Sequence, residues 1–404
     1  MKCSIQAKII KDIILNIAVV VRTLRIGGME RVAANLSDAF KKKGHNVTLI
    51  YLKDKPVQIK PDDNDIDIRL LNLDKLLLRT GIGFFWIVLS AFLNIVFRKS
   101  LFVWKGYFQT KIFFRELKKI EVKKGKFDLI IARGQGTFEL IWNHRDQRVI
   151  QVCENIFRHK NPGFLGRFYS RLLFNGKKIV CVSNGVFEDF LEYQKSCFIE
   201  PKLLKMITNP IDIESIRKQS KLEVKEIPDY PYILGLGRFV PQKNFFRLIK
   251  AYRILVDEYK IPHKLVLAGD GREKNALVSF VRELNLESNV FFPGFAFNPY
   301  AWMAFSSVFV LSSDFEGLGM VIIEAFASGT NVVAVNSPGG VKDIMMTGEL
   351  NEQLSDFTPE SLAMVIYKTL NKPIPHEEIR KVLDKFSPDF IVSQYLELIS
   401  KEII

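Results

Sequence analysis

Glu316 and Glu324 are the residues of this sequence whose type and spacing most directly suggest chemistry. The compact apolar run at 307–311 is typical of a buried strand, and the loop after it carries Glu316 and two glycines. The apolar run from Met320 predicts a helix, whose first turn would offer free backbone N–H groups and a positive dipole end to an anion. Each carboxylate can accept two hydrogen bonds from a vicinal diol. A site that binds phosphate and polyol together suggests a nucleotide-sugar.

Two cations are expected beside this loop. Arg238 follows a predicted strand that starts at Tyr232, and Lys243 comes five residues later, so both should stand at the same edge of a parallel sheet as Glu316. Two cations can neutralise a diphosphate leaving group, a task that many enzymes give to a divalent metal. No Asp-x-Asp motif or His/Asp cluster occurs in a plausible site, and the five histidines are isolated. We therefore predict no metal and no cofactor, with the nucleotide-sugar as a co-substrate.

Strands and helices alternate along most of the chain. In the first half, a β-branched run at 13–24 leads into Gly27-Gly28 and then into a helical pattern at 32–43. This turn lacks the G-x-G-x-x-G spacing of dinucleotide-binding domains, which argues against a dehydrogenase. A second series starts at Tyr232, after a boundary at Asn209-Pro210 and a poorly patterned charged segment at 214–231. The alternation predicts an α/β fold with two doubly wound, Rossmann-like domains.

Composition limits the partners and the compartment. A chain of 404 residues favours two domains, and its net charge of +14 favours an anionic partner. We expect no nucleic acid, since no helix-turn-helix, finger or RNA-binding aromatic motif is present. The four cysteines form no C-x-x-C pair, which indicates reduced thiols in the cytosol. Charged residues scattered through 1–17 interrupt any apolar core of a secretion signal.

The region 82–126 predicts contact with a membrane. Its first part, 81–97, is the most hydrophobic segment of the chain but falls just short of a membrane span. Its second part interleaves many lysines with aromatic residues. Apolar and basic side chains in one region suggest helices lying on an anionic membrane surface. The alternative is a pair of core helices with a solvated basic face.

The segment SSDFEGLGMVIIEAFASGTNVVA at 312–334 resembles the signature of the retaining, family-four (group 1) glycosyltransferases. The GGMERV stretch at 27–32, the G-R-x4-K stretch at 237–243, and AGDG at 268–271 resemble other motifs of that family, in the same order. The resemblance implies the glycosyltransferase-B fold, in which two Rossmann-like domains face each other across a cleft. It implies an acceptor-side domain at 1–208, a nucleotide-sugar domain at 209–385, and a C-terminal helix at 386–404 that crosses back to the first domain.

The resemblance also assigns roles to individual residues. Arg238 and Lys243 look like the clamp on the donor's diphosphate, and Glu324 looks like the ligand of the ribose diol. Glu316 would contact the donor sugar, so Glu316, Arg238 and Lys243 are the expected catalytic residues. The remaining donor-binding candidates are Gly27, Gly28, Gly237, Gly269, Gly294, Phe295, Gly317, Leu318, Gly319 and Met320. Strand ends in the first half supply acceptor-side candidates: Arg133, Glu154, Asn155, Ser183 and Asn184.

The sequence departs from the family pattern at two places. Many members carry a His where Cys153 stands, so Glu154 or Asn155 would replace its contact with the donor sugar. The turn at 347–350 is shorter than usual. We expect a retaining transferase that moves a sugar from a UDP- or GDP-sugar to a lipid-linked or lipopolysaccharide-type acceptor, in the cytoplasm and peripheral on the inner membrane face. The alternatives are a soluble sugar or glycan acceptor, or a non-catalytic basic membrane-binding protein on a decayed transferase fold.

Overall fold

The computed structural model describes residues 13–25, 27–157 and 162–400. Most of the segment 1–17, on which the prediction about a secretion signal rests, lies outside these residues. The chain divides into two compact units: residues 1–210 together with 388–404, and residues 211–387. These boundaries fall within two residues of those predicted at 208/209 and 385/386. The last helix, α17 (Pro388–Ser400), is grouped with the N-terminal unit.

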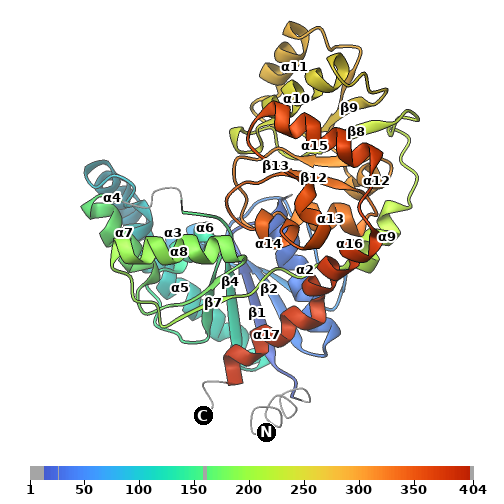
Figure 1. The fold of residues 1–404 in the computed structure, drawn as a ribbon. Coiled ribbons are helices and arrows are strands. Elements are labelled where there is room, and N and C mark those ends of the chain that lie inside the picture. The colour runs from blue at the N-terminus through green and yellow to red at the C-terminus, as the bar shows by residue number, and fades with distance from the viewer. Residues whose placement is uncertain (1–12, 26, 158–161, 401–404) are drawn as a thin grey trace. The chain divides into compact units, whose positions relative to one another are not determined.

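The N-terminal unit is built on a parallel sheet of seven strands, in the order β3-β2-β1-β4-β5-β6-β7 over the described residues (Figure 1). The central strands are fully buried and rich in Ile and Val, as expected of strands covered on both faces. The strands are β1 (Asn16–Val21), β2 (Asn46–Tyr51), β3 (Asp67–Leu70), β4 (Leu129–Arg133), β5 (Val149–Cys153), β6 (Lys178–Cys181) and β7 (Leu203–Met206). The helices are α2 (Gly28–Lys42), α3 (Leu73–Leu78), α4 (Gly83–Val96), α5 (Leu101–Lys124), α6 (Gln135–Phe138), α7 (Phe164–Phe174) and α8 (Asn184–Cys197).

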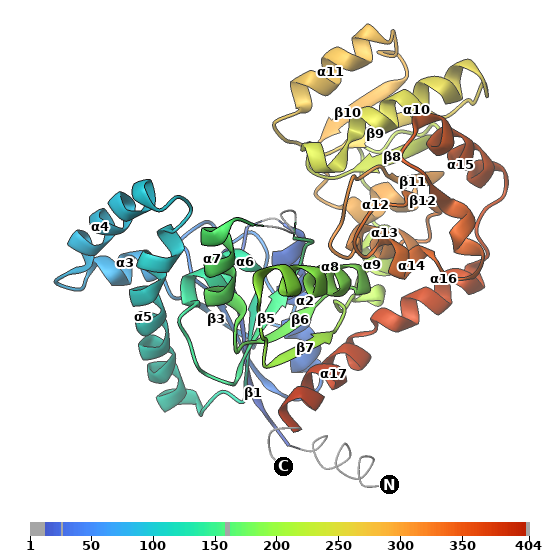
Figure 2. The ribbon, with the colours of Figure 1, turned by 60° about the vertical axis from the view of Figure 1, so that its left-hand side comes forward.

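The C-terminal unit carries a parallel sheet of six strands, in the order β10-β9-β8-β11-β12-β13 (Figure 2). Helices α10, α11 and α15 cover one face of this sheet and enclose an apolar cluster. The strands are β8 (Tyr232–Leu236), β9 (Lys264–Ala268), β10 (Val290–Gly294), β11 (Val308–Leu311), β12 (Val332–Val335) and β13 (Leu354–Ser355). The helices are α9 (Ile213–Ser220), α10 (Phe245–Asp257), α11 (Lys274–Glu283), α12 (Pro299–Ala304), α13 (Met320–Ala327), α14 (Val341–Met345), α15 (Pro359–Asn371) and α16 (His376–Leu383). The prediction of two Rossmann-like domains is confirmed.

Local capping explains where the structure differs from the predicted elements. Helix α2 begins four residues before the apolar pattern, because Gly27 caps it and its first turn is polar, with Glu30 as its acidic residue. Helix α9 lies in the segment without a clear pattern, where the Asp212 side chain accepts a hydrogen bond from the Ser215 N–H at 2.9 Å. Short polar helices of this kind depend on their caps more than on an apolar stripe.

Helix α17 packs against α2 within the N-terminal unit. The rings of Phe40 and Tyr395 lie 6.2 Å apart in an edge-on arrangement, and the Lys43 amine lies 2.9 Å from the Asp389 carboxylate. Tyr395 is fully buried. The helix is therefore part of the core of this unit.

Candidate active site

The carboxyl ends of β8 and β11 mark the point where the C-terminal sheet changes its winding direction. From β8 the chain proceeds outward through β9 and β10, whereas β11 lies on the other side of β8 and is followed outward by β12 and β13. Ligands of doubly wound sheets bind outside the strand ends at such a switch point. The loops that leave these two strands are 237–244 and 312–319, which carry the predicted catalytic residues.

Lys243 and Glu316 meet at this switch point. The Lys243 Nζ lies 2.6 Å from the Glu316 Oε1, and the Ser313 hydroxyl donates to the same oxygen at 2.6 Å. Glu316 and Ser313 are buried, and Lys243 is half-buried. A buried carboxylate that holds an amine and a hydroxyl is fixed in one orientation. The structure thus brings together two of the three predicted catalytic residues.

Further hydrogen bonds join the two loops. The Gln242 amide donates to the Phe315 carbonyl at 3.0 Å, and the Asn244 amide donates to the Asp314 carboxylate at 3.0 Å. Arg247, in the first turn of α10, lies 2.7 Å from the same carboxylate. The loop after β8 and the loop after β11 therefore form one framework that fixes the site before any ligand binds.

Glycines permit close backbone approach around this framework. Gly269 has φ of +146°, and a Cβ there would lie 1.9 Å from the carbonyl oxygen of Gly237. Gly339, after β12, has φ of +105°, and a Cβ there would lie 1.6 Å from the carbonyl oxygen of Glu316. Both positions require glycine, because other residues would be strained and would displace a site loop. The Glu316 N–H also donates to the Pro338 carbonyl at 3.0 Å.

The other predicted donor-binding residues of this unit surround the same strand ends. Gly319 caps α13 with φ of +87°, and Glu324 lies within that helix, half-buried. Arg238 is exposed, and no hydrogen bond or ion pair of its side chain is found in the described part of the chain. The remaining candidates lie at the ends of β10 and β11: Gly294, Phe295, Gly317, Leu318 and Met320.

The predicted residues of the N-terminal unit occupy strand ends of their own sheet. Gly27 and Gly28 begin α2. Ser183 is buried and caps α8 by accepting the Val186 N–H at 3.1 Å, while Asn155 and Asn184 are exposed. Ser183 thus has a local structural task that its position already explains.

Arg133 and Glu154 face each other inside the N-terminal unit. Arg133 is completely buried, and its Nη2 lies 2.5 Å from the Glu154 Oε1 and 2.7 Å from the Asn209 Oδ1. Burial raises the pKa of Glu154, and the Arg133 charge opposes this. Burial also raises the pKa of Tyr395, to about 12. Arg133 and Glu154, two of the acceptor-side candidates, therefore belong to a buried polar cluster beneath α17.

Several residues of the site framework were absent from the sequence prediction. Ser313, Gln242, Asn244 and Asp314 became evident only from their contacts across the two loops. The sequence indicates these four residues only by their position, because each lies within a loop that directly follows a buried strand. Gly339 follows a buried strand in the same way.

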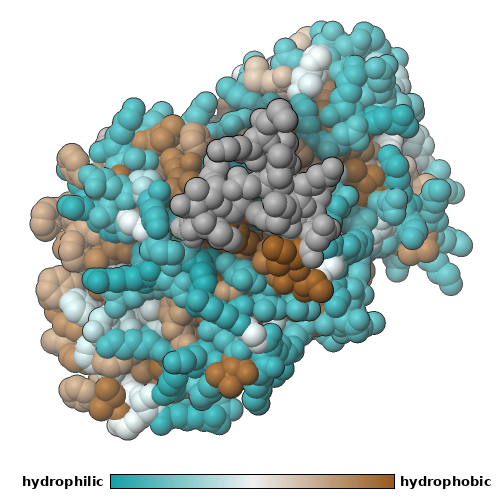
Figure 3. Space-filling view, turned by 90° about the horizontal axis from the view of Figure 1, so that it is seen from below, coloured by the Kyte–Doolittle hydropathy of each residue, from teal (hydrophilic) through white to brown (hydrophobic). Residues whose placement is uncertain are grey.

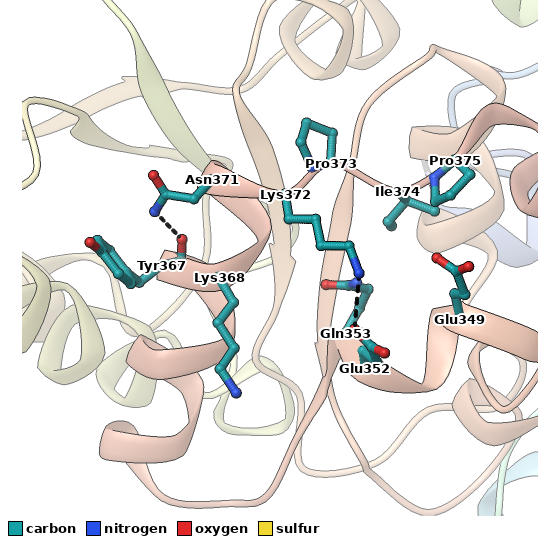
Figure 4. Close-up of a pocket in the computed structure, with 10 residues that line it drawn as sticks. All are labelled: Glu349, Glu352, Gln353, Tyr367, Lys368, Asn371, Lys372, Pro373, Ile374 and Pro375. Atoms are coloured by element: carbon teal, nitrogen blue, oxygen red, sulfur yellow. Dashed lines mark hydrogen bonds and ion pairs between the residues drawn. The ribbon is translucent and has the colours of Figure 1, made fainter.

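A cavity lies elsewhere in the C-terminal unit. It has a volume of about 520 Å³ and is lined by the 3-10 helix Gly348–Gln353 and by the end of α15 with the residues after it (Figure 4). Ile374 in its wall donates to Asn331, which precedes β12, so the cavity lies toward the amino ends of the strands. None of the predicted site residues lines it. We place the functional site at the strand ends because the charged and glycine-rich loops gather there.

Comparison with known proteins decides the family. The model of "Glycosyltransferase Family 4" matches residues 26–215, and that of "Glycosyl transferases group 1" matches residues 216–386. The chain belongs to the family-four glycosyltransferases. The two models meet near the boundary between the two structural units, so this glycosyltransferase has one family domain in each unit.

Relatives of this glycosyltransferase include a transferase named for a diphospho-undecaprenol substrate and one named for lipopolysaccharide core biosynthesis. It is 32% identical over 209 residues to the N-acetylgalactosamine-N,N'-diacetylbacillosaminyl-diphospho-undecaprenol 4-alpha-N-acetylgalactosaminyltransferase of Campylobacter jejuni, a match that covers 50% of this chain and 55% of that one. The chain therefore spans about half the length of that relative. It is 28% identical over 245 residues to the lipopolysaccharide core biosynthesis glycosyltransferase LpsE of Rhizobium meliloti, which covers 59% of this chain and 69% of that one.

A solved structure supports the fold. The HepE protein of Anabaena, crystallised with UDP and glucose, matches 96% of this chain and 98% of its own, with a TM-score of 0.63 and 17% identity. At that identity the likeness shows the glycosyltransferase fold alone.

Proposed function

We propose that this glycosyltransferase moves a sugar from a UDP- or GDP-sugar to a lipid-linked or lipopolysaccharide-type acceptor, with retention of anomeric configuration and without a metal ion. The observation that carries the proposal is the Lys243–Glu316 pair at the switch point of the C-terminal sheet, with Arg238 exposed on the same loop. The Campylobacter relative's acceptor is a diphospho-undecaprenol carrier, and the Anabaena structure holds UDP. Both agree with the proposed substrates.

The proposed chemistry follows from the charges at this site. Arg238 and Lys243 would bind the diphosphate and stabilise its negative charge as the bond to the sugar breaks. The donor would draw Lys243 away from Glu316, whose carboxylate then accepts hydrogen bonds from the sugar hydroxyls. The acceptor hydroxyl attacks from the face that the nucleoside diphosphate leaves, which retains the configuration. Single contacts of this kind contribute roughly 3 kcal/mol to lowering the barrier.

An activity screen tests the reaction. Purified protein is incubated with a panel of nucleotide-sugars, with and without EDTA, while release of nucleoside diphosphate is measured. We expect one donor to be turned over, at a rate that EDTA does not change, and NMR of the released sugar, recorded before it mutarotates, to show retention. Loss of activity with EDTA would contradict the metal-independent chemistry. Absence of both turnover and binding with every donor would favour a decayed, non-catalytic fold.

The lipid part of the proposal rests on helix α4. Its fourteen residues include no charged side chain, and Phe84 and Ile95 are 72% and 75% exposed. Phe164 at the start of α7 is 85% exposed. Figure 3 shows brown side chains along the left, the side on which Figure 1 places α4 and α7. Exposed apolar surface of this extent indicates an interaction site.

Basic residues accompany this apolar surface. The segments that flank α4, and helix α7 itself, add exposed cations: Arg79, Arg98, Lys99, Arg167 and Arg171. Apolar side chains bordered by cations fit an anionic lipid surface. No helix of the described residues is long and apolar enough to cross a bilayer. Helix α5 differs from α4, because Ile112, Phe113 and Leu117 bury one of its faces in the core.

Vesicle sedimentation tests the membrane part. We expect the protein to pellet with vesicles that contain phosphatidylglycerol, and the Phe84→Ser/Phe92→Ser variant to stay in the supernatant. Phe297→Ser is a matched control, since Phe297 is exposed but lies in the C-terminal unit. Wild-type protein that stays in the supernatant would favour a soluble acceptor.

A further inference from the structure

The N-terminal sheet has a switch point of its own, between β1 and β4. The chain proceeds from β1 outward through β2 and β3 on one side, and from β4 through β7 on the other. Arg22 directly follows β1, and Lys53 follows β2 by two residues. The Lys53 N–H donates to the Arg22 carbonyl at 3.0 Å, which holds the two loops together. This is the position at which a doubly wound sheet binds a ligand.

Two cations from different elements meet at one carboxylate there. The amines of Lys105 in α5 and Lys53 lie 2.8 and 3.8 Å from the Asp74 carboxylate of α3, and their side chains are 21% and 27% exposed. Burial lowers the pKa of Lys53, Asp74 opposes this, and the charges of Arg22, Lys105 and Lys55 lower it further. These cations are therefore close enough to repel one another, which an additional anion would relieve.

Two other carboxylates lie near this cluster, Asp54 next to Lys53 in the chain and Glu139 near Arg22. Asp54 is exposed and accepts a hydrogen bond from the Asn72 amide at 3.5 Å. Glu139 accepts from the Gln135 amide at 2.9 Å, and its burial raises its pKa while Arg22 opposes this. Neither carboxylate forms an ion pair with a cation of the cluster in the described part of the chain.

Arg22 is the cation best placed to receive a ligand. Its side chain is exposed, and no ion pair or hydrogen bond of its guanidinium is found among the described residues. It lies over Gly136 of α6, where a Cβ would come within 2.9 Å of its Nη1. Glycine at that position leaves room for the guanidinium, whose planar fork suits phosphate oxygens.

We propose that Arg22, Lys53 and Lys105 form a binding site for a phosphate or diphosphate group carried by the acceptor. This inference rests on the proposed function, since it deepens the identity of the acceptor. Helix α4 contacts both α3, which carries Asp74, and α5, which carries Lys105, so the site lies beside the helix with the exposed apolar side chains. A lipid-borne phosphate would meet the cations while its hydrocarbon chain meets α4.

Binding of a diphosphate probe tests the site. Farnesyl diphosphate is titrated into protein already saturated with UDP, so that the donor site is occupied. We expect Arg22→Gln to raise the Kd for farnesyl diphosphate roughly tenfold or more, because a charge-assisted hydrogen bond is lost. Arg22→Gln/Lys53→Gln should weaken it further. The Kd for UDP should stay unchanged in both variants. Lys118→Gln/Lys123→Gln, on the exposed side of α5, is the control for the double variant, because it removes the same two charges. It should bind the probe like wild type.

The outcomes separate this site from the proposed donor chemistry. Equal affinity of wild type and Arg22→Gln for farnesyl diphosphate, or no binding by either, overturns the site. Failure to bind both UDP and GDP concerns the proposed function instead, and a protein that binds only GDP is saturated with GDP before the titration. If Arg22→Gln loses binding to phosphatidylglycerol vesicles but keeps its affinity for farnesyl diphosphate, the cations bind bulk lipid and the assignment to the acceptor is wrong.

Discussion

Substitution of Gly339 by Ala offers a sharp test of the way the site is held. Gly339 has φ of +105°, and an added Cβ would lie 1.6 Å from the Glu316 carbonyl oxygen. The left-handed backbone costs a residue with a Cβ about 1–2 kcal/mol. Forcing the two loops apart adds about 1–3 kcal/mol, which is the usual cost of overpacking. Gly339→Ala should therefore lower the free energy of unfolding by about 2–5 kcal/mol.

Gly329→Ala provides the matched control. Gly329 also has positive φ, +88°, but no atom lies within 4 Å of its added Cβ. Gly329→Ala should lower the free energy of unfolding only by the backbone cost of about 1–2 kcal/mol. The two variants therefore share the cost of positive φ and differ in the contact with the backbone of Glu316 and Gly317.

Measurements of the Tm and of the turnover rate together test the prediction for Gly339→Ala. For a domain of this size each kcal/mol shifts the Tm by about 2–4 °C. We expect the Tm of Gly339→Ala to fall well below that of Gly329→Ala, and its turnover to fall about 100-fold, as for a catalytic group displaced by about 1 Å. Equal Tm values and equal turnover in the two variants would refute the argument that the loop after β12 positions Glu316.

Two further predictions concern buried charge in the N-terminal unit. Burial lowers the pKa of His144 from 6.5 to about 3, so the unfolded state binds the proton between those values and stability falls as the pH drops through this window. In urea unfolding at pH 7 and pH 5, this group should lower the free energy of unfolding by up to about 1.4 kcal/mol per pH unit. The loss should be shallower in His144→Gln. The same pH dependence in the variant and in wild type would contradict this role of His144. Arg133→Met should cost about 3–5 kcal/mol, because it leaves Glu154 buried without its cation. Addition of Glu154→Gln should restore part of that stability, and a single variant as stable as wild type would show that the pair is dispensable.

The sequence predicted the parts of the site that depend on strand ends. Lys243 and Glu316 each lie in a loop after a buried strand, and parallel strands bring such loops to one edge. Their direct contact at 2.6 Å could not be predicted, because spacing along the chain does not fix the order of strands in the sheet. The need for glycine at position 339 could not be predicted either, because an added Cβ would clash with the backbone of a different loop.

Burial was harder to predict than element type. Arg133 ends a strand and so resembles a ligand-facing residue, but Asn209 and Tyr395, distant in sequence, close over it. The apolar segment at 81–97 fits equally a core helix and a surface helix by composition. Only the packing of its neighbours shows that one face of α4 is exposed while α5 is anchored in the core.

We propose that Lys243 and Glu316 carry the reaction at the switch point of the C-terminal sheet. The most direct measurement is kcat for release of nucleoside diphosphate, in wild type, Lys243→Ala, Glu316→Gln and the control Lys250→Ala, whose side chain is exposed on α10. We predict that kcat falls about 100-fold or more in the two site variants, as for loss of one electrostatic contact in a transition state, and stays at the wild-type value in the control. Wild-type kcat in both Lys243→Ala and Glu316→Gln, with the fold intact, would contradict the account.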